Sequence, residues 1–476
     1  MNAAARAALV GAALLLAGCA TTAIDDNFAA VDGFSRERLG SEVRWLKSEE
    51  DRQAMTREVD RLLAAPLAGD DAVRIALGYS PAFQTVLAEA AASSADATRS
   101  ARLPNPVFTF ERLVRDGHAG REVEIGRALG FSLFDILLLP VRRERAALRQ
   151  QQTRLEASAA VVGLVAEVRQ AWVRAVAAEQ LARYQQDVAE AAEAAAELAR
   201  RMQGVGNFSR LQRAREQAFH ADAVADLARA RQQAAASREA LVRLLGLPAT
   251  QAARLTLPER LPDLPSAPRE EAAVTQAALD ERLDERLDVR LARAELDATA
   301  RALGLTRVTS VVDGLHVAAL HNRETGEAPQ RGFEIELPLP LFDFGDAARA
   351  ADEARYLAAL NRTGQVALEA ASQVRESHAA WRTAWALARH YRDEIVPLRQ
   401  RISEEMLLQY NGMLIGVFEL LADARARIAS VSQAIEAERD FWLADAGLEA
   451  ALIGSPVAPL ALPPRAADGD AGGGGH

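Results

Sequence analysis

Residues 123–133 read VEIGRALGFSL, and residues 333–341 read FEIELPLPL. In both stretches large apolar residues alternate with acidic, small or proline residues. A period of two is typical of a β-strand with one face in an apolar environment and the other in water. Candidate partner strands lie at 107–113 and 315–320, and lengths of about ten residues suit a tilted strand that crosses a membrane. A pair of soluble hairpins packed on a core is the alternative that this pattern leaves open.

The two strand pairs belong to an internal repeat with a spacing of 208 residues (341 − 133). Three landmarks share this spacing: LFD at 133–135 recurs at 341–343, Gly204 recurs as Gly412, and the LG at 245–246 recurs as IG at 453–454. Because three landmarks keep one register, we expect that one structural unit has been duplicated.

Long helices are predicted after each strand pair. The stretch 141–201 lacks proline and is rich in strong helix formers, and a helix of that length would approach ~90 Å. Its counterpart is predicted at 347–411, interrupted only by Gly364 and Pro397, with returning helices at 209–245 and 417–453. Two further helices, at 71–102 and 270–303, precede the strands. The fold class predicted is mainly α with a membrane β-barrel portion, built from two tandem strand–strand–long helix–helix repeats.

The expected segments follow from these elements and from the composition of the connections. They are a signal peptide at 1–18, an N-terminal segment at 19–70, a first repeat at 71–246, a proline-rich linker at 247–269, a second repeat at 270–454, and a disordered tail at 455–476.

The first residues predict export and lipidation. An apolar run at 7–16, too short to span a bilayer, follows Arg6 and ends in LAGC at 16–19. This pattern resembles a bacterial lipobox, in which Cys19 carries the lipid and becomes the mature N-terminus. Ala20 in the next position favours the outer membrane. Cys19 is the only cysteine in the chain, so no internal disulfide can form.

Composition excludes several classes of function. The net charge of −10 argues against nucleic acid as a partner. No apolar run after the signal is long enough for a transmembrane helix, so insertion into a bilayer would use strands. Four strands cannot close a barrel, and two or three chains would have to share one.

Catalysis is not predicted. The chain has no GxSxG, CxxC or HExxH motif, and its seven histidines lack the helical spacing of metal ligands. No cofactor and no metal site are therefore expected.

The residues resemble the TolC-type outer-membrane efflux channels. The resemblance rests on the lipobox, on RLPNP at 102–106 before a strand, on DAVRIAL at 71–77, on LLG at 244–246, and on the order of the duplicated unit. It implies a homotrimer that shares one 12-stranded barrel in the outer membrane and a long helical tunnel in the periplasm. It also implies a periplasmic adaptor protein and an inner-membrane pump of the resistance–nodulation–division type as partners.

The resemblance also assigns roles to the two turns between helices. Residues 204–209 (GVGNFS) and 412–417 (GMLIGV) would be the ends that dock onto the adaptor, and Ser209 with Gln212 has capping-box spacing. The second turn is unusually apolar for a turn exposed to solvent. The docking residues expected are Gly204, Asn207, Ser209, Gly412, Met413, Leu414 and Gly416.

A constriction at the periplasmic entrance is the last role that the resemblance implies. Glu419 lies at the best-matching position, seven residues after Gly412. A second carboxylate of the family falls at Ala422, with Asp423 adjacent. Three Glu419 side chains near one axis would repel one another and bind cations. A solvated charge on a helix is an equally weighted alternative.

The function expected is the exit duct of a tripartite efflux system that exports small toxic compounds or metal ions. The exit channel of a type I protein secretion system is an alternative, but its channels usually lack a lipobox. A structural coiled-coil tether is another, and the strand alternation disfavours it.

Overall fold

The computed structural model describes residues 19–117, 120–266, 283–309, 314–339 and 341–454. The chain forms two compact units. Unit 1 contains residues up to 37, 85–159 and 287–368, and unit 2 contains 38–84, 160–286 and the residues from 369 onward. The expected signal peptide and C-terminal tail lie outside the described residues.

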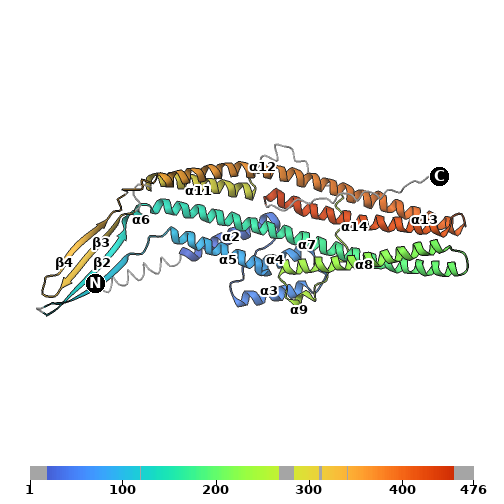
Figure 1. Ribbon diagram of the computed structural model, residues 1–476, viewed down its shortest axis with the longest axis horizontal. Helices are drawn as coiled ribbons and strands as arrows, with labels where there is room; N and C mark the ends of the chain where they lie inside the picture. Colours follow the sequence, from blue (N-terminus) through green and yellow to red (C-terminus); the bar gives the residue numbers. More distant parts are fainter. Residues whose placement is uncertain (1–18, 118–119, 267–282, 310–313, 340, 455–476) are drawn as a thin grey trace. The chain divides into compact units, whose positions relative to one another are not determined.

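Unit 1 contains one antiparallel sheet with the strand order β1-β2-β3-β4 (Figure 1). The strands are β1 (Val107–Gly117), β2 (Gly120–Ser132), β3 (His316–Glu324) and β4 (Gln330–Glu336). All four strands were expected. However, β4 ends at Glu336 rather than at 341, because Pro338 and Pro340 have no N–H to donate to a ladder.

Helices of unit 1 continue directly from the sheet. Ser132 ends β2, and its hydroxyl accepts a hydrogen bond of 3.3 Å from Asp135 N at the start of α6 (Leu133–Leu137). The other helical segments of this unit belong to α2 (Cys19–Leu39), α5 (Pro81–Ser100), α7 (Leu139–Gly204), α11 (Leu287–Thr309) and α12 (Asp346–His390).

Polar side chains join the unit 1 helices in pairs. The Asn27 amide donates to Ser94 Oγ at 2.8 Å between α2 and α5, and the Thr363 hydroxyl donates to Ala292 O at 3.2 Å between α12 and α11. Part of the predicted helix 270–303 falls outside the described residues, and α11 begins at Leu287.

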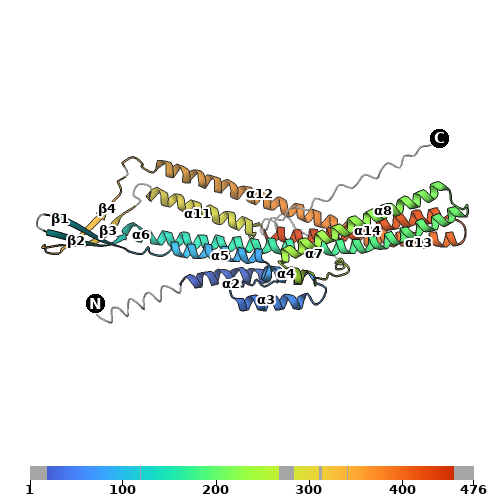
Figure 2. The same cartoon turned by 60° about the horizontal axis from the view of Figure 1, so that its bottom comes forward.

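Unit 2 is helical and contains two hairpins (Figure 2). In the first, α7 turns back into α8 (Arg210–Leu245). In the second, α13 (Val396–Asn411) turns back into α14 (Val417–Ile453). The shorter helices α3 (Glu49–Leu62), α4 (Gly69–Tyr79) and α9 (Ala249–Ala252) complete this unit. A single helix was predicted over 71–102, but Pro81 separates α4 from α5.

Helices α8 and α14 end in the same kind of glycine cap, at positions 208 residues apart. Gly246 caps α8 with φ +71°, and Gly454 caps α14 with φ +99°. Both are left-handed conformations that glycine adopts without a steric penalty. A Cβ on Gly246 would also lie 2.3 Å from Cδ of Pro81, so glycine is required there twice over.

The predicted helix 347–411 is interrupted by one turn of π-helix, η2 (Tyr391–Ile395). Pro397 follows two residues later. Its ring cannot donate a hydrogen bond and would clash with the carbonyl four residues earlier, at Asp393. The wider π turn accommodates this ring, so the helix continues as α13 instead of ending.

The described part of the inter-repeat linker packs within unit 2. Leu264 belongs to a core cluster with Trp381 and Phe441, and the Trp442 indole donates a hydrogen bond of 3.0 Å to Pro262 O. The Arg392 guanidinium of η2 donates to Leu264 O at 3.5 Å. The proline-rich stretch before residue 267 is therefore an ordered strap across α14 and η2.

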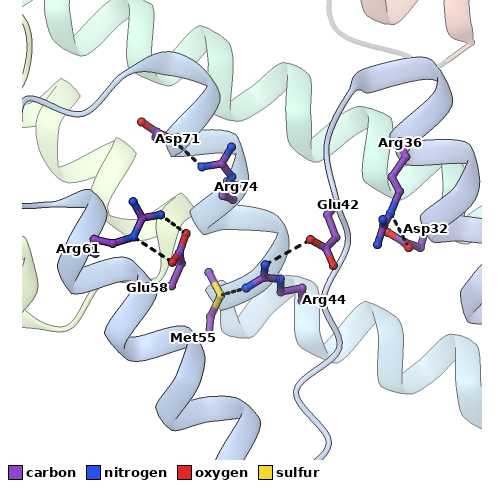
Figure 3. A network of polar contacts seen from close by, with 9 residues as sticks. All are labelled: Asp32, Arg36, Glu42, Arg44, Met55, Glu58, Arg61, Asp71 and Arg74. Atoms are coloured by element: carbon purple, nitrogen blue, oxygen red, sulfur yellow. Dashed lines mark hydrogen bonds and ion pairs between the residues drawn. The ribbon is translucent and has the colours of Figure 1, made fainter.

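The α3–α4 pair packs through Met55, whose side chain fills the space above Gly78. Around it lie exposed ion pairs, including Glu58–Arg61 at 2.6 Å and Asp71–Arg74 at 3.0 Å (Figure 3). Such exposed pairs each contribute about 0–1 kcal/mol, so apolar packing of Met55 and Val59 accounts for most of the stability here.

Candidate functional site

The sheet separates charge between its two faces. The strand register places Thr109, Gly126, Asn322 and their neighbours on one face, and this face lines a hollow in the surface. We call it the acidic face, because its charged strand residues are six glutamates and one arginine. They are Glu111, Glu122, Glu124, Glu324, Glu334, Glu336 and Arg115.

The opposite face of the sheet, called here the apolar–basic face, carries large apolar residues and arginines. Near the end of β2 that joins α6, its exposed residues are aromatic and aliphatic: Phe108, Leu129, Phe131, Phe333 and Ile335. Phe333 is 76% exposed. Further from α6 the same face carries Arg112, Arg121, Arg127, Arg323 and Arg331, with Asp116 as the one carboxylate among its described strand residues. An exposed apolar surface of this kind marks a contact with another molecule or with lipid.

Each edge of the sheet is open. Within the described residues, β1 pairs only with β2, and β4 pairs only with β3. Unpaired edge strands present backbone N–H and C=O groups that can extend a sheet into another chain.

The end of the first helical hairpin is a well-capped turn. Ser209 forms the predicted capping box: its hydroxyl accepts from Gln212 N at 3.2 Å, and Gln212 Oε1 accepts from Ser209 N at 2.6 Å. Gly204 ends α7, and Asn207 N donates to Met202 O at 2.9 Å. The neighbouring Val205 is 73% exposed.

The end of the second hairpin is apolar and conformationally strained. Met413 is 92% exposed and Leu414 is 78% exposed. Met413 has φ +59°, a left-handed conformation that is unfavourable for a side chain of this size. Gly416 takes the N-cap of α14 without any side-chain hydrogen bond, because this turn has no counterpart of Ser209.

The two hairpin ends contact each other inside unit 2. The rings of Phe208 and Phe418 lie 4.7 Å apart between centroids, and Phe208 is 7% exposed. Behind this pair, Arg425 of α14 binds Glu216 of α8 at 2.7 Å and stacks over the Phe219 ring at 4.5 Å. Neither contact could be found from sequence, since each joins positions about two hundred residues apart.

The two predicted constriction carboxylates differ in environment. Glu419 is exposed in the first turn of α14, and its Oε2 lies 2.9 Å from where a Cβ on Gly416 would be. The side chain thus folds back over the positive end of the helix dipole. Asp423 is 9% exposed and accepts a hydrogen bond from the Ser403 hydroxyl of α13. Asp423 therefore joins the two helices of its own hairpin.

Cys19 is the first residue of α2, and the residues before it lie outside the described part of the chain. Within the described residues, no three His, Cys, Asp or Glu side chains gather in a way that could hold a metal ion. Among the described helices, none is both long and apolar enough to cross a membrane.

One carboxyl in unit 2 was not singled out by its sequence. Glu438 of α14 is partly buried beside the linker strap, and loss of solvent together with the charge of Asp263 raises its pKa to about 7. The charges of Arg260 and Arg392 lower the pKa of Glu438, but by less. The sequence around Glu438 gives no signal of this raised pKa, because its cause is a packing contact with residues distant in sequence.

No protein-family model and no curated protein sequence matches the chain. Several solved structures do. A membrane protein from Pseudomonas aeruginosa is 20% identical, with a TM-score of 0.68, and the match covers 84% of this chain and 90% of that one.

Two further structures are similar. The outer membrane protein VceC from Vibrio cholerae is 14% identical, with a TM-score of 0.67 and coverage of 85% of this chain and 98% of VceC. The open state of the Neisseria gonorrhoeae MtrE outer membrane channel is 18% identical, with a TM-score of 0.66 and coverage of 80% and 88%.

Each of these matches covers at least 80% of this chain. The solved proteins of this fold are channels rather than enzymes. The chain therefore has the fold of the TolC-type outer-membrane channels, as the resemblance in its sequence predicted.

Proposed function

We propose that this protein is the outer-membrane exit duct of a tripartite efflux system. Three copies would share one 12-stranded barrel, and their helices would line a tunnel in the periplasm. The cargo would be small toxic compounds or metal ions, delivered by an inner-membrane pump of the resistance–nodulation–division type through a periplasmic adaptor protein.

The observation that carries this proposal is the two-faced sheet with open edges. An acidic face and an apolar–basic face suit a wall between an aqueous lumen and lipid. Backbone groups left unpaired in lipid cost several kcal/mol each, so β1 of one copy would pair with β4 of the next. A ring of three copies closes the sheet without leaving an edge.

The helical hairpin ends support the docking part of the proposal. Met413 and Leu414 are exposed apolar residues on a strained turn. A turn that faced only solvent would require neither the apolar side chains nor the strain. An adaptor that covers them would remove this apolar surface from water. Gly204, Asn207 and Ser209 of the first end would form a second, more polar contact, so the two ends would bind the adaptor differently.

The test combines mass and conductance measurements on detergent-solubilised full-length protein. We expect a mass of three chains and discrete conductance steps in planar lipid bilayers. The steps should be cation-selective, because carboxylates of the acidic face would line the lumen. Glu334→Gln with Glu336→Gln should lower the cation selectivity, whereas Arg331→Gln on the other face should not. A stable monomer that still conducts would contradict the shared barrel.

A cellular experiment tests export itself. Deleting the gene should raise the intracellular accumulation of an ethidium-type dye or a heavy-metal ion, and the wild-type gene should restore export. If a Met413→Asp/Leu414→Asp gene restores export fully, docking through this turn is wrong.

A further inference from the structure

The arginines of the apolar–basic face are arranged in rows across the sheet. Arg127 of β2 lies opposite His321 of β3, and His321 lies opposite Arg331 of β4. In the next row, away from α6, Arg112 and Arg323 lie on either side of Ile125. All four arginines are exposed, and none forms an ion pair with a carboxylate of the described residues.

Apolar residues also lie within these rows, at Phe110 opposite Arg127, and beyond them, at Val114 opposite Val123, but the rows that lack any charge lie on the α6 side. The row next to Arg127 is Phe108, Leu129, Ala319 and Phe333, and the row after it contains Phe131, Val317 and Ile335. The four arginines thus lie in two adjacent rows, and the two rows next to them on the α6 side contain no charged residue. The glutamates of the same strands all point to the other face, so this basic surface is not neutralised by its own sheet.

This arrangement limits the depth at which the sheet can lie in a bilayer. An arginine on the lipid-facing side of a barrel is costly at the midplane, but the cost falls nearly to zero at the interface. The apolar rows must therefore contact acyl chains, and the two basic rows must lie at headgroup level. Because β2 enters α6 at the opposite end, the basic rows belong to the leaflet away from the helices.

We propose that these two rows bind phosphate-bearing lipid headgroups of the outer leaflet. The inference rests on the proposed function, because it takes the sheet to be part of a barrel with its helices in the periplasm. Guanidinium groups bind phosphate oxygens through two parallel N–H donors. Because the arginines lie in two rows, they suit a lipid that carries more than one phosphate. Charge complementarity and the adjoining apolar rows together favour a lipid over free phosphate, which would gain nothing from Phe108 and Phe333.

The experiment measures which lipids co-purify with the full-length trimer. Mixed micelles with equal amounts of phosphatidylcholine and bisphosphorylated lipid A are the probe, and native mass spectrometry counts the lipids on each trimer. We expect wild type to enrich lipid A. Arg127→Gln should reduce the enrichment roughly fivefold, and Arg127→Gln/Arg331→Gln roughly 25-fold, from the usual contribution of one basic residue near an anionic surface. Salt at about 1 M should weaken binding in wild type.

The matched control is Arg115→Gln, which removes one arginine from the acidic face of β1. It should leave the enrichment unchanged. Arg127→Lys keeps the charge but loses the paired N–H donors, so it should bind lipid A more weakly than wild type and more strongly than Arg127→Gln, which separates charge from misfolding. Inorganic phosphate added in excess should not displace lipid A, and full displacement would show a simple anion site instead.

The two proposals fail in different ways. If wild type forms a conducting trimer but Arg127→Gln and Arg115→Gln enrich lipid A equally, the headgroup site is wrong and the duct stands. If wild type forms no trimer and no conducting step, the barrel is wrong, and the orientation of the basic rows is overturned with it.

Discussion

Glu216 of α8 and Arg425 of α14 form an ion pair of 2.7 Å between the two helical hairpins, with the glutamate only 2% exposed. Among the described residues, the second carboxylate oxygen of Glu216 and the Nε of Arg425 have no hydrogen-bond partner. Glu216 is thus buried and incompletely hydrogen-bonded, whereas the Arg425 side chain remains 36% exposed. The ion pair joins the hairpins at the cost of desolvating the Glu216 carboxylate.

Removing one partner of this pair should destabilise unit 2. Glu216→Ala leaves the Arg425 guanidinium unpaired, and we expect a loss on the order of 1–3 kcal/mol. The thermal unfolding midpoint of the helical circular dichroism signal measures this loss. Glu239→Ala, at an exposed position on the same helix, is the control. The double variant Glu216→Leu/Arg425→Leu should recover most of the stability, and a double variant as unstable as Glu216→Ala would contradict this account.

Glu438 should make stability depend on pH. Its pKa is raised to about 7, first by burial and then by the charge of Asp263. A carboxyl with a raised pKa is favoured in its neutral form in the folded protein. Its stabilising contribution to the free energy of unfolding is therefore fully present below about pH 4.5 and is lost as the pH rises through about 7. In wild type, the thermal unfolding midpoint should decrease as the pH is raised from 5.5 to 8.

Glu438→Gln should flatten this pH dependence, because it keeps the shape of the neutral acid and cannot ionise. Glu436→Gln, at an exposed position two residues away, should leave it as in wild type. Equal slopes in wild type and Glu438→Gln would show that other groups set the pH dependence.

Alternation located β2 and β4, and β1 and β3 were predicted as their partners. The distribution of charge between the two faces of the sheet could be seen only from the register between the strands. Local alternation says which residues share a face within one strand, and only pairing shows that Arg127, His321 and Arg331 form one row. The helix boundaries were predictable where glycine or proline marks them, as at Gly246. An interruption at Pro397 was predicted, although its π-helical geometry was not, and the break at Pro81 was missed.

Contacts between the repeats were beyond prediction for a different reason. Phe208–Phe418 and Glu216–Arg425 depend on the tertiary packing of two hairpins, and a single sequence contains no periodic signal for them. The same holds for Glu438, whose environment is created by the strap before residue 267.

Lipidation is expected to depend on Cys19. Cells grown with a radioactive fatty acid should label the wild-type protein, and Cys19→Ser should remove the label because no other cysteine is present. Immunoblotting controls for the amount of protein. Equal label in both proteins would contradict the lipobox interpretation.

The second hairpin end should bind the adaptor through apolar contact. Met413→Asp/Leu414→Asp places two charges on the turn, and we expect at least a tenfold loss of affinity for the adaptor in surface plasmon resonance. Asn411→Asp adds a charge beside the turn without removing apolar surface and should have a smaller effect. Met413→Gly should relieve the left-handed strain but still weaken binding. Unchanged affinity in the double variant would place the docking contact elsewhere.

Glu419 is expected to set the ion preference of the periplasmic entrance. The hypothesis rests on its position seven residues after Gly412 and on its exposure at the start of α14, where three copies could approach one axis. Glu419→Ala and Glu419→Gln should both weaken the block by divalent cations applied from the periplasmic side of a planar bilayer. Glu419→Gln separates charge from size, because it keeps the volume and removes the repulsion. Glu405→Gln, at an exposed position on α13, is the control for a distant charge. If both Glu419 variants keep wild-type conductance and wild-type block by divalent cations, the constriction lies elsewhere. The Glu419 carboxylate would then act only on the N-terminus of α14, over which it folds.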